Sequence, residues 1–315
     1  YGLEFKVVAI SDPIKGSLFN ERGLSLDRVL SLVKEKGSLN DYRDAEKGWD
    51  SIKTIEDSNC NIVVEATPTN LKTAEPGKSH ILKALNLGKH VITTNKGPIA
   101  LFYHELAEVA RRNSAFLRFE GTVLSGTPAI NLSLETLAGS EVGEIRGIVN
   151  GTTNFILTEM ALGKSYEDAL KEAQRLGYAE TDPTADVEGW DAVAKVMILG
   201  NVVMGGNLKV EDVEREGITG ISQENIKSAN AEGKVIKLIA RVNREGSLVK
   251  GKVSPERVDE GDFLAQVKGA INALTFKTDT LGEITVVGPG AGRRETGFSL
   301  LNDFIHVHRS LVHEG

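Results

Sequence analysis

Residues 61–98 read NIVVEATPTNLKTAEPGKSHILKALNLGKHVITTNKGP, and this stretch decides the fold. An apolar, β-rich run at 61–66 is followed by an amphipathic stretch at Lys78–Leu87, which ends at Gly88, and by a second apolar run at His90–Thr94. We expect a strand, a helix and a strand, because glycine is typical directly after a helix. Two strands joined by a helix indicate a βαβ unit and a parallel sheet.

The same alternation continues on both sides of this stretch. Before it we expect a buried strand at Phe5–Ser11 and a helix near Leu26–Lys34, and after it a helix at Pro98–Arg112 and a strand at Phe116–Phe119. Ligands of parallel sheets bind in the loops at the carboxyl ends of the strands. Four loops rich in hydroxyls, glycine or charge occupy those positions: Ser11–Lys15, Thr67–Asn70, Thr94–Pro98 and Glu120–Thr127.

The pattern of the chain changes after about Thr127, which predicts a second domain. The expected helices are Ala129–Leu137, Ser165–Leu176 and Val187–Met204, and the expected strands are Glu144–Val149, Val235–Val242, Leu248–Val253, Leu274–Thr278 and Glu283–Val287. A last helix, Gly292–Ser310, is expected to return to the first domain. We therefore predict an α/β domain at 1–127, completed by 288–315, and a second domain at 128–287.

Composition narrows the classes of function. The chain has 315 residues, 40% of them hydrophobic, and its net charge of -7 argues against nucleic acid as a partner. The single cysteine, Cys60, permits no intrachain disulfide. No apolar stretch approaches the roughly 20 residues that span a bilayer, and no signal peptide is visible. We expect a cytoplasmic protein without a membrane partner.

The segment richest in chemistry is GYAETDPTADVEGWDAVAK at 177–195. Asp191 and Lys195 are four residues apart, so a helix places them on one face. On spacing alone, an exposed ion pair is the simpler interpretation. The carboxylates just before the helix favour another, because crowded carboxylates attract a cation such as a substrate ammonium, and a lysine beside them can exchange a proton with a hydroxyl.

Three further motifs each permit two interpretations. Thr94–Pro98 is either a plain strand-to-helix turn or a loop that presents Lys96 to a ligand. Gly288–Gly292 lies between a strand and a helix, as phosphate-binding turns do, but lacks the GxGxxG spacing and equally suits a tight turn. Asn150–Asn154 either caps a helix or presents small polar groups to a ligand.

Taken together, these segments resemble the homoserine dehydrogenase family. The resemblance rests on 147–157, Gly177–Lys195, Gly288–Gly292 with Glu295 and Thr296, and Val91–Pro98, in the same order along the chain. It implies a Rossmann-type dinucleotide-binding domain followed by an α+β catalytic and dimerisation domain. It also implies the NAD(P)-dependent interconversion of L-homoserine and L-aspartate 4-semialdehyde in threonine and methionine biosynthesis, by a homodimer.

The resemblance assigns roles to individual residues. Lys195 resembles the proton donor and acceptor, Asp191 its substrate-binding neighbour, and Glu180 the residue that holds the ammonium of the amino-acid substrate. Asp186, Gly151 and Thr152 belong to the same substrate pocket. The implied cofactor-binding residues are Thr67, Lys96, Gly177, Gly290 and Gly292. Glu120, Val123, Ser125 and Thr127 resemble the loop for a monovalent cation, usually sodium, in which one carboxylate and several main-chain oxygens suit a hard ion.

The start of the chain departs from the family pattern. The first strand, its GxGxxG turn and the first helix are expected before Phe5 and are missing, so we expect that roughly 30 residues of one βα unit are omitted. After the glycine turn we expect no regulatory domain. The choice of cofactor stays open, because Asp12 would favour the ribose of NAD, whereas Lys15 would meet the phosphate of NADP.

Two other functions remain compatible with the sequence. The first is another dehydrogenase on the same two-domain plan, acting on a different amino acid or aldehyde. The second is a non-catalytic protein that binds a cofactor or oligomerises, although an intact Asp191 and Lys195 pair argues against it. Homoserine-dependent formation of NAD(P)H discriminates among the three.

Overall fold

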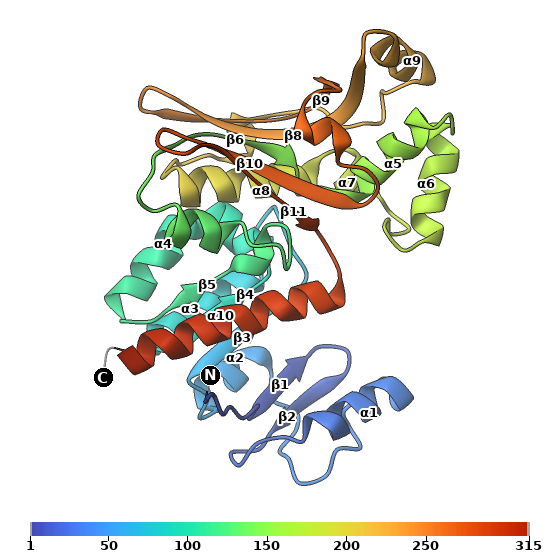
Figure 1. Cartoon of the computed structure of the whole chain (residues 1–315). Coiled ribbons are helices and arrows are strands. Elements are labelled where there is room, and N and C mark those ends of the chain that lie inside the picture. The colour runs from blue at the N-terminus through green and yellow to red at the C-terminus, as the bar shows by residue number, and fades with distance from the viewer. Residues whose placement is uncertain (1, 314–315) are drawn as a thin grey trace.

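The structure is a computed structural model that describes residues 2–313. Figure 1 shows a parallel sheet in the first part of the chain, a larger sheet in the second, and a long C-terminal helix that returns to the first part. Within residues 2–313, every helix is too short or too polar to cross a membrane.

The central unit of the first part is the predicted βαβ unit. β3 (Ile62–Glu65) pairs in parallel with β4 (His90–Thr93), and α3 (Gly77–Asn86) connects them. α4 (Lys96–Arg112) then leads to β5 (Leu117–Arg118), which pairs in parallel with β4. α4 begins two residues before the predicted start because the Asn95 side chain caps it by accepting a hydrogen bond from Gly97 N. Lys96 is therefore the first residue of that helix.

The predicted strand at Phe5–Ser11 is wrong in extent and in partner. β1 (Ala9–Asp12) pairs antiparallel with β2 (Gly16–Phe19), and Phe5 is 55% exposed. The tight turn at Asp12 brings the chain straight back, so the hydrogen bonds of the run go to β2 and not to the parallel sheet. α1 (Leu26–Lys36), as predicted, and α2 (Ser51–Asp57), which was not predicted, complete this region.

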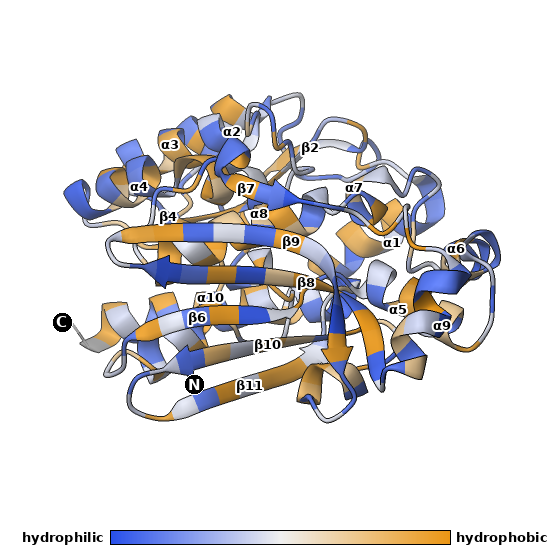
Figure 2. Ribbon diagram, turned by 90° about the horizontal axis from the view of Figure 1, so that it is seen from above, coloured by the Kyte–Doolittle hydropathy of each residue, from blue (hydrophilic) through white to orange (hydrophobic). Residues whose placement is uncertain are grey.

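The second part contains a six-stranded sheet in the order β11-β10-β6-β8-β9-β7. Figure 2 looks onto one face of this sheet, with α4, α5 and α8 on the far side. The four strands predicted after residue 230 are confirmed. They belong to this sheet together with the strand predicted at Glu144–Val149. The strand bounds are β6 (Val142–Ile148), β7 (Val213–Arg215), β8 (Lys234–Glu245), β9 (Leu248–Asp259), β10 (Ile271–Thr278) and β11 (Gly282–Pro289).

The helix predicted at Val187–Met204 is interrupted. Gly189 has a φ of 83°, a left-handed conformation that favours glycine and ends the preceding turn. The remaining helices are α5 (Gly151–Ala161), α6 (Tyr166–Arg175), α7 (Thr184–Val187), α8 (Trp190–Ile198), α9 (Gln223–Ala231) and the short turns η1 (Glu120–Thr122), η2 (Leu132–Thr136), η3 (Leu199–Val203), η4 (Val210–Asp212) and η5 (Phe263–Gln266).

The last helix, α10 (Arg293–His313), returns to the first part of the chain as predicted. Figure 1 shows α10 lying across the parallel sheet, and the helix contacts β4 and η1. Asp303, which is 1% exposed, accepts a hydrogen bond from Glu120 N at 2.9 Å. This hydrogen bond ties the middle of α10 to the start of η1.

Candidate active site

Lys195 lies in α8 and is almost completely buried. Its side chain is 8% exposed. The ammonium donates to the main-chain carbonyl of Val149 at 2.6 Å and to Asp191 Oδ2 at 2.7 Å. An ammonium has three donors, so one N–H remains for another group. The pair is therefore not the exposed helix ion pair that spacing alone favours.

Asp191 connects Lys195 to the first part of the chain. Its second oxygen, Oδ1, lies 3.5 Å from Lys96 Nζ at the start of α4. Burial alone would raise the pKa of the Asp191 carboxyl, but the charges of Lys195 and Lys96 and the hydrogen bonds from Lys195 and Asn150 hold that pKa well below its usual range. Asp191 is therefore a carboxylate throughout the neutral pH range.

Asn150 organises the same cluster from the N-terminus of α5. Its Oδ1 accepts a hydrogen bond from Thr153 N at 2.9 Å, and its Nδ2 donates to Asp186 Oδ1 at 2.7 Å and Asp191 Oδ2 at 3.0 Å. The residue thus caps the helix, which confirms one interpretation of its motif, and its amide binds two carboxylates of the cluster. Presentation of this motif to a ligand stays a prediction. Sequence reasoning quoted Asn150 without placing it in the site.

Asp186 lies in the same cluster, but its pKa is shifted in the opposite direction. Burial and the nearby charge of Asp191 raise the pKa of its carboxyl, against the hydrogen bonds from Asn150 and Thr152. Two neighbouring carboxylates therefore have pKa values moved in opposite directions, an arrangement typical of functional sites.

The remaining carboxylates of 177–195 do not join this cluster. Glu188 accepts hydrogen bonds from Arg215 and Thr219, and Asp182 accepts one from Thr184 N. The Glu180 side chain is exposed. The crowding expected from the sequence is thus limited to Asp186 and Asp191.

The loop after α6 borders the N-terminus of α5. Thr152 Oγ1 donates to the main-chain carbonyl of Tyr178 at 2.7 Å, and Gly151 is the first residue of α5. Gly177 has a φ of 78° and is exposed, with open space where a β-carbon would stand. The predicted substrate residues Gly151 and Thr152 and the predicted cofactor residue Gly177 therefore lie around one loop.

Thr67 and Lys96 follow adjacent parallel strands, at the edge where dinucleotides bind. Asn95 Nδ2 donates to Thr67 Oγ1 at 3.2 Å and thereby links the two loops. Thr67 also donates to Glu65, a carboxylate that is 2% exposed at the end of β3. Sequence reasoning missed Glu65, because within an apolar strand it carries no distinguishing pattern.

The glycine-rich turn at 288–292 packs against the loop predicted to bind a cation. Thr127 Oγ1 donates to the carbonyl of Pro289 at 3.0 Å, and Ser125 Oγ lies 2.9 Å from Thr296 Oγ1. A β-carbon on Gly288 would collide with Thr127. The predicted cofactor residues Gly290 and Gly292 are thus fixed relative to the predicted cation loop.

The Glu120 carboxylate, predicted as a cation ligand, accepts three backbone hydrogen bonds. Its Oε1 accepts hydrogen bonds from Ala129 N at 2.7 Å and Ile130 N at 3.1 Å, and its Oε2 accepts one from Asn131 N at 2.7 Å. The carboxylate thus satisfies the free backbone donors before η2, and these hydrogen bonds use most of its acceptor capacity.

The main-chain oxygens of the same loop remain compatible with an ion. Those of Val123, Ser125 and Thr127 accept no backbone hydrogen bond from residues 2–313. In this described range, no three His, Cys, Asp or Glu side chains are arranged to hold a metal ion. A cation at this loop would therefore rely on main-chain carbonyls.

Asp12 ends β1, and its carboxylate is bonded within its own hairpin. Its Oδ1 accepts hydrogen bonds from Ile14 N and Lys15 N, both at 2.8 Å, and its Oδ2 lies 3.3 Å from Lys15 Nζ. Those backbone hydrogen bonds are the largest cause that lowers the pKa of the Asp12 carboxyl. Asp12 therefore stabilises the turn of the β1–β2 hairpin, and Lys15 partly neutralises it.

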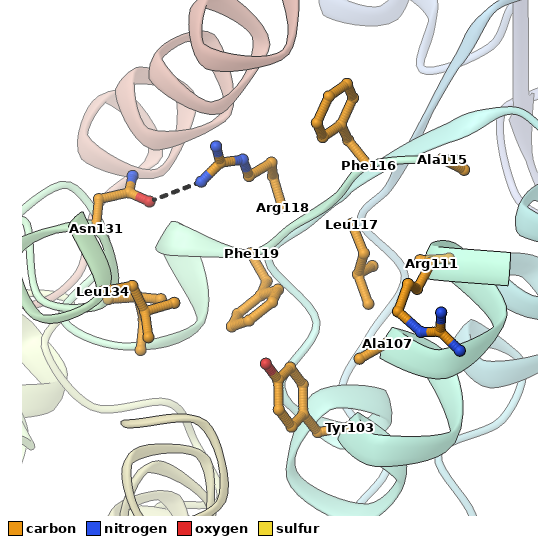
Figure 3. Close-up of a pocket in the computed structure, with 12 residues that line it drawn as sticks. Tyr103, Ala107, Arg111, Ala115, Phe116, Leu117, Arg118, Phe119, Asn131 and Leu134 are labelled. Carbon is orange, nitrogen blue, oxygen red and sulfur yellow. Dashed lines mark hydrogen bonds between the residues drawn. The ribbon is translucent and has the colours of Figure 1, made fainter. Parts of the chain in front are cut away.

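A pocket of about 270 Å³ between α4, β5 and the helical turn near residue 131 contains none of the predicted site residues. Figure 3 shows Tyr103 and Phe119 facing each other in it and Arg118 donating to Asn131. The cluster of buried charged and polar side chains described above lies instead around Lys195.

Comparisons with known proteins agree on one family. A family model described as homoserine dehydrogenase matches residues 128–305, and one described as homoserine dehydrogenase, NAD binding domain, matches residues 25–120. A homoserine dehydrogenase of Methanocaldococcus jannaschii is 45% identical over 308 residues, covering 98% of this chain and 90% of that protein.

Two further relatives concern the cofactor. A protein of Pseudomonas canavaninivorans named NAD(+)-dependent homoserine dehydrogenase is 43% identical over 311 residues, covering 98% of this chain and 88% of that protein. A solved structure of a hyperthermophilic archaeal homoserine dehydrogenase in complex with NADPH has a TM-score of 0.82 and 32% identity, covering 97% of this chain and 88% of that one.

Proposed function

The chain belongs to the homoserine dehydrogenase family of NAD(P)-dependent oxidoreductases, and we propose that Lys195 is the group that exchanges the hydroxyl proton of its substrate. The reaction interconverts L-homoserine and L-aspartate 4-semialdehyde. The bound nicotinamide cofactor accepts or supplies the hydride. The protein must therefore orient the substrate and move one proton at its oxygen.

The hydrogen bonds of Lys195 carry this proposal. Two of its three ammonium donors are held by Val149 O and Asp191, which leaves one proton for a substrate oxygen. In reduction, Lys195 gives this proton to the aldehyde oxygen as the hydride reaches the carbon. In oxidation, the neutral amine takes the hydroxyl proton as the hydride leaves. The two protein hydrogen bonds fix the direction of the third position.

Asp191 has two tasks in the proposal. Its carboxylate orients Lys195 through Oδ2 and holds Lys96 through Oδ1. Because the pKa of Asp191 is lowered, its carboxyl does not compete with Lys195 for the transferred proton. Asn150 fixes Asp191 in turn, so the geometry of the pair is set from α5 as well as from α8.

The amino-acid part of the substrate is assigned to the loop after α6 and the start of α5. Glu180 is proposed to bind the ammonium, and its exposed side chain is free to do so. Asp186, Gly151 and Thr152 form the inner wall beside Asp191. Charge supports this arrangement, because an ammonium stabilises neighbouring carboxylates.

The residues at the edge of the parallel sheet fit a nicotinamide cofactor. Thr67, Lys96, Gly177, Gly290 and Gly292 are proposed to hold it, since two of them follow adjacent parallel strands and two lie in the glycine turn that precedes α10. Asp12 and Lys15 remain the candidates that decide between NAD and NADP.

A monovalent cation, sodium by preference, is proposed at the loop formed by Glu120, Val123, Ser125 and Thr127. Main-chain oxygens would supply the ligands, because the Glu120 carboxylate is committed to backbone N–H groups. The ion would brace the loop against which the glycine turn packs.

A homodimer formed through the second domain, at 128–287, is proposed on the family resemblance. One face of the six-stranded sheet, toward the viewer in Figure 2, lies opposite α4, α5 and α8, and we propose it as the pairing surface. Light scattering on the purified chain measures its mass and should give twice 34.0 kDa.

One assay tests the proposed function as a whole. Purified protein is mixed with L-homoserine and either NAD or NADP, and the reduced cofactor is followed by absorbance. We expect reduction that depends on homoserine. Reduction of the cofactor with another hydroxy amino acid, and none with homoserine, would instead indicate a different dehydrogenase on this fold.

A further inference from the structure

Asn272, in β10, is a buried amide without a partner. The residue is 0% exposed, and neither its Oδ1 nor its Nδ2 has a hydrogen-bond partner among the described residues. A side-chain amide has two donors and an accepting oxygen, and such groups inside proteins are nearly always satisfied. In the working protein, the Asn272 amide therefore has a hydrogen-bond partner that is not among these contacts.

The surroundings of Asn272 indicate where that group lies. A β-carbon on Gly290 would collide with the Asn272 side chain, and one on Gly151 would lie 3.4 Å from Asn272 Oδ1. Gly290 belongs to the glycine-rich turn after β11, and Gly151 is the first residue of α5, directly after Asn150. The amide therefore lies between the turn proposed to hold the cofactor and the helix that positions Asp191.

We propose that Asn272 is a positioning residue, whose amide holds the glycine-rich turn of 288–292 against the start of α5 when cofactor is bound. Main-chain N–H and C=O groups of the turn are complementary to an amide, either directly or through one ordered water. Glycine at 290 allows the backbone to approach this closely. This inference rests on the proposed function. In it, Asn272 links the proposed cofactor site to the proposed substrate site.

A purely structural role for Asn272 predicts something different, and the same strand offers a matched control. Thr275 is also buried in β10, at 3% exposure, and its Oγ1 lies 2.9 Å from Thr285 Oγ1 on β11. Loss of that hydrogen bond should lower stability without touching the glycine turn. Thr275→Val is therefore the control for loss of a buried polar group in this strand.

The test measures kcat, the KM of each substrate and the melting temperature of Asn272→Ala, Asn272→Asp and Thr275→Val. For Asn272→Ala we expect the KM for NAD(P) to rise about tenfold, the effect of losing one well-placed hydrogen bond, while the KM for homoserine changes less. Asn272→Asp keeps the shape and the acceptor and should recover part of this loss. Thr275→Val should change only the melting temperature.

A double-mutant cycle tests the placement directly. Gly290→Ala should raise the KM for NAD(P) strongly in the wild-type background and less in the Asn272→Ala background, where the colliding side chain is shortened. An unchanged KM in Asn272→Ala, or equal effects of Gly290→Ala in both backgrounds, would overturn the inference. If the wild-type protein formed no NAD(P)H from homoserine, the proposed function itself would fail, so the two failures are distinguishable.

Discussion

Lys96 Nζ lies 3.5 Å from Asp191 Oδ1, so an ammonium at the start of α4 meets a carboxylate in α8. This contact joins the edge of the parallel sheet to the helix that carries Lys195. Because the other oxygen of Asp191 holds Lys195, one carboxylate fixes two lysines, one on each side of the junction. The proposed chemistry depends on that shared carboxylate.

Removing the charge of Asp191 should lower the turnover rate strongly. Asp191→Asn keeps the size of the side chain but weakens its hold on both lysines, and we expect kcat for homoserine oxidation to fall on the order of 10²-fold. Steady-state kinetics measure it. Asp182→Asn is the control, since Asp182 is an exposed carboxylate of the same segment; an equal loss in both variants would contradict the role of Asp191.

Glu180 is expected to act on substrate binding alone. Glu180→Gln removes the charge proposed to pair with the ammonium, so the KM for homoserine should rise about tenfold or more, while the KM for NAD(P) stays unchanged. Initial rates at varied concentrations of each substrate separate the two constants. A rise in both, or in neither, would show that the Glu180 side chain does not bind the amino acid.

The buried contact between Asp303 and Glu120 should make stability depend on pH. Burial raises the pKa of Asp303 to about 7, with a further contribution from the charge of Glu120. Between the ordinary aspartate pKa of about 3.9 and this raised value, the folded protein holds a proton that the unfolded chain has lost. Stability should therefore fall as pH rises through that interval and level off above it.

Urea unfolding at several pH values measures this dependence. Asp303→Asn should flatten the decline, because the amide cannot ionise, while the exposed Asp259→Asn should leave the decline in place. An identical slope in Asp303→Asn and the wild type would mean that Asp303 does not cause the effect.

Removal of monovalent cations tests the loop at Val123–Thr127. Exchange of sodium for a large organic cation should lower the rate of homoserine oxidation. Ser125→Ala keeps every main-chain oxygen, so its half-saturating sodium concentration should stay within about threefold of the wild type, well under one tenfold step of affinity. Equal rates in both buffers would show that homoserine oxidation does not need sodium.

The sequence predicted most of the elements because their patterns are local. The unit at 61–93 combines apolar runs with a helix that ends at glycine, and the structure confirms it. The hairpin at β1 and β2 was not foreseen, because a short apolar run does not reveal whether its partner is a parallel strand or the residues that follow. The break at Gly189 was missed, since a single glycine inside an apolar periodic stretch is also tolerated within helices.

The candidate site was predictable in part. Spacing placed Asp191 beside Lys195, which the structure confirms. Spacing could not show that Asn150, 41 residues earlier in the chain, holds Asp191. Nor could it show that backbone donors occupy the Glu120 carboxylate. Contacts of this kind depend on how distant elements pack, and no local pattern encodes them.

The most direct measurement is the single-turnover rate of homoserine oxidation by Lys195→Ala, with cofactor affinity measured in parallel by fluorescence. A general acid or base typically contributes about 10²–10⁴-fold, so we predict a loss of that size with the dissociation constant for NAD(P)H nearly unchanged. A wild-type rate in this variant, with normal cofactor binding, would contradict the assignment of proton transfer to Lys195.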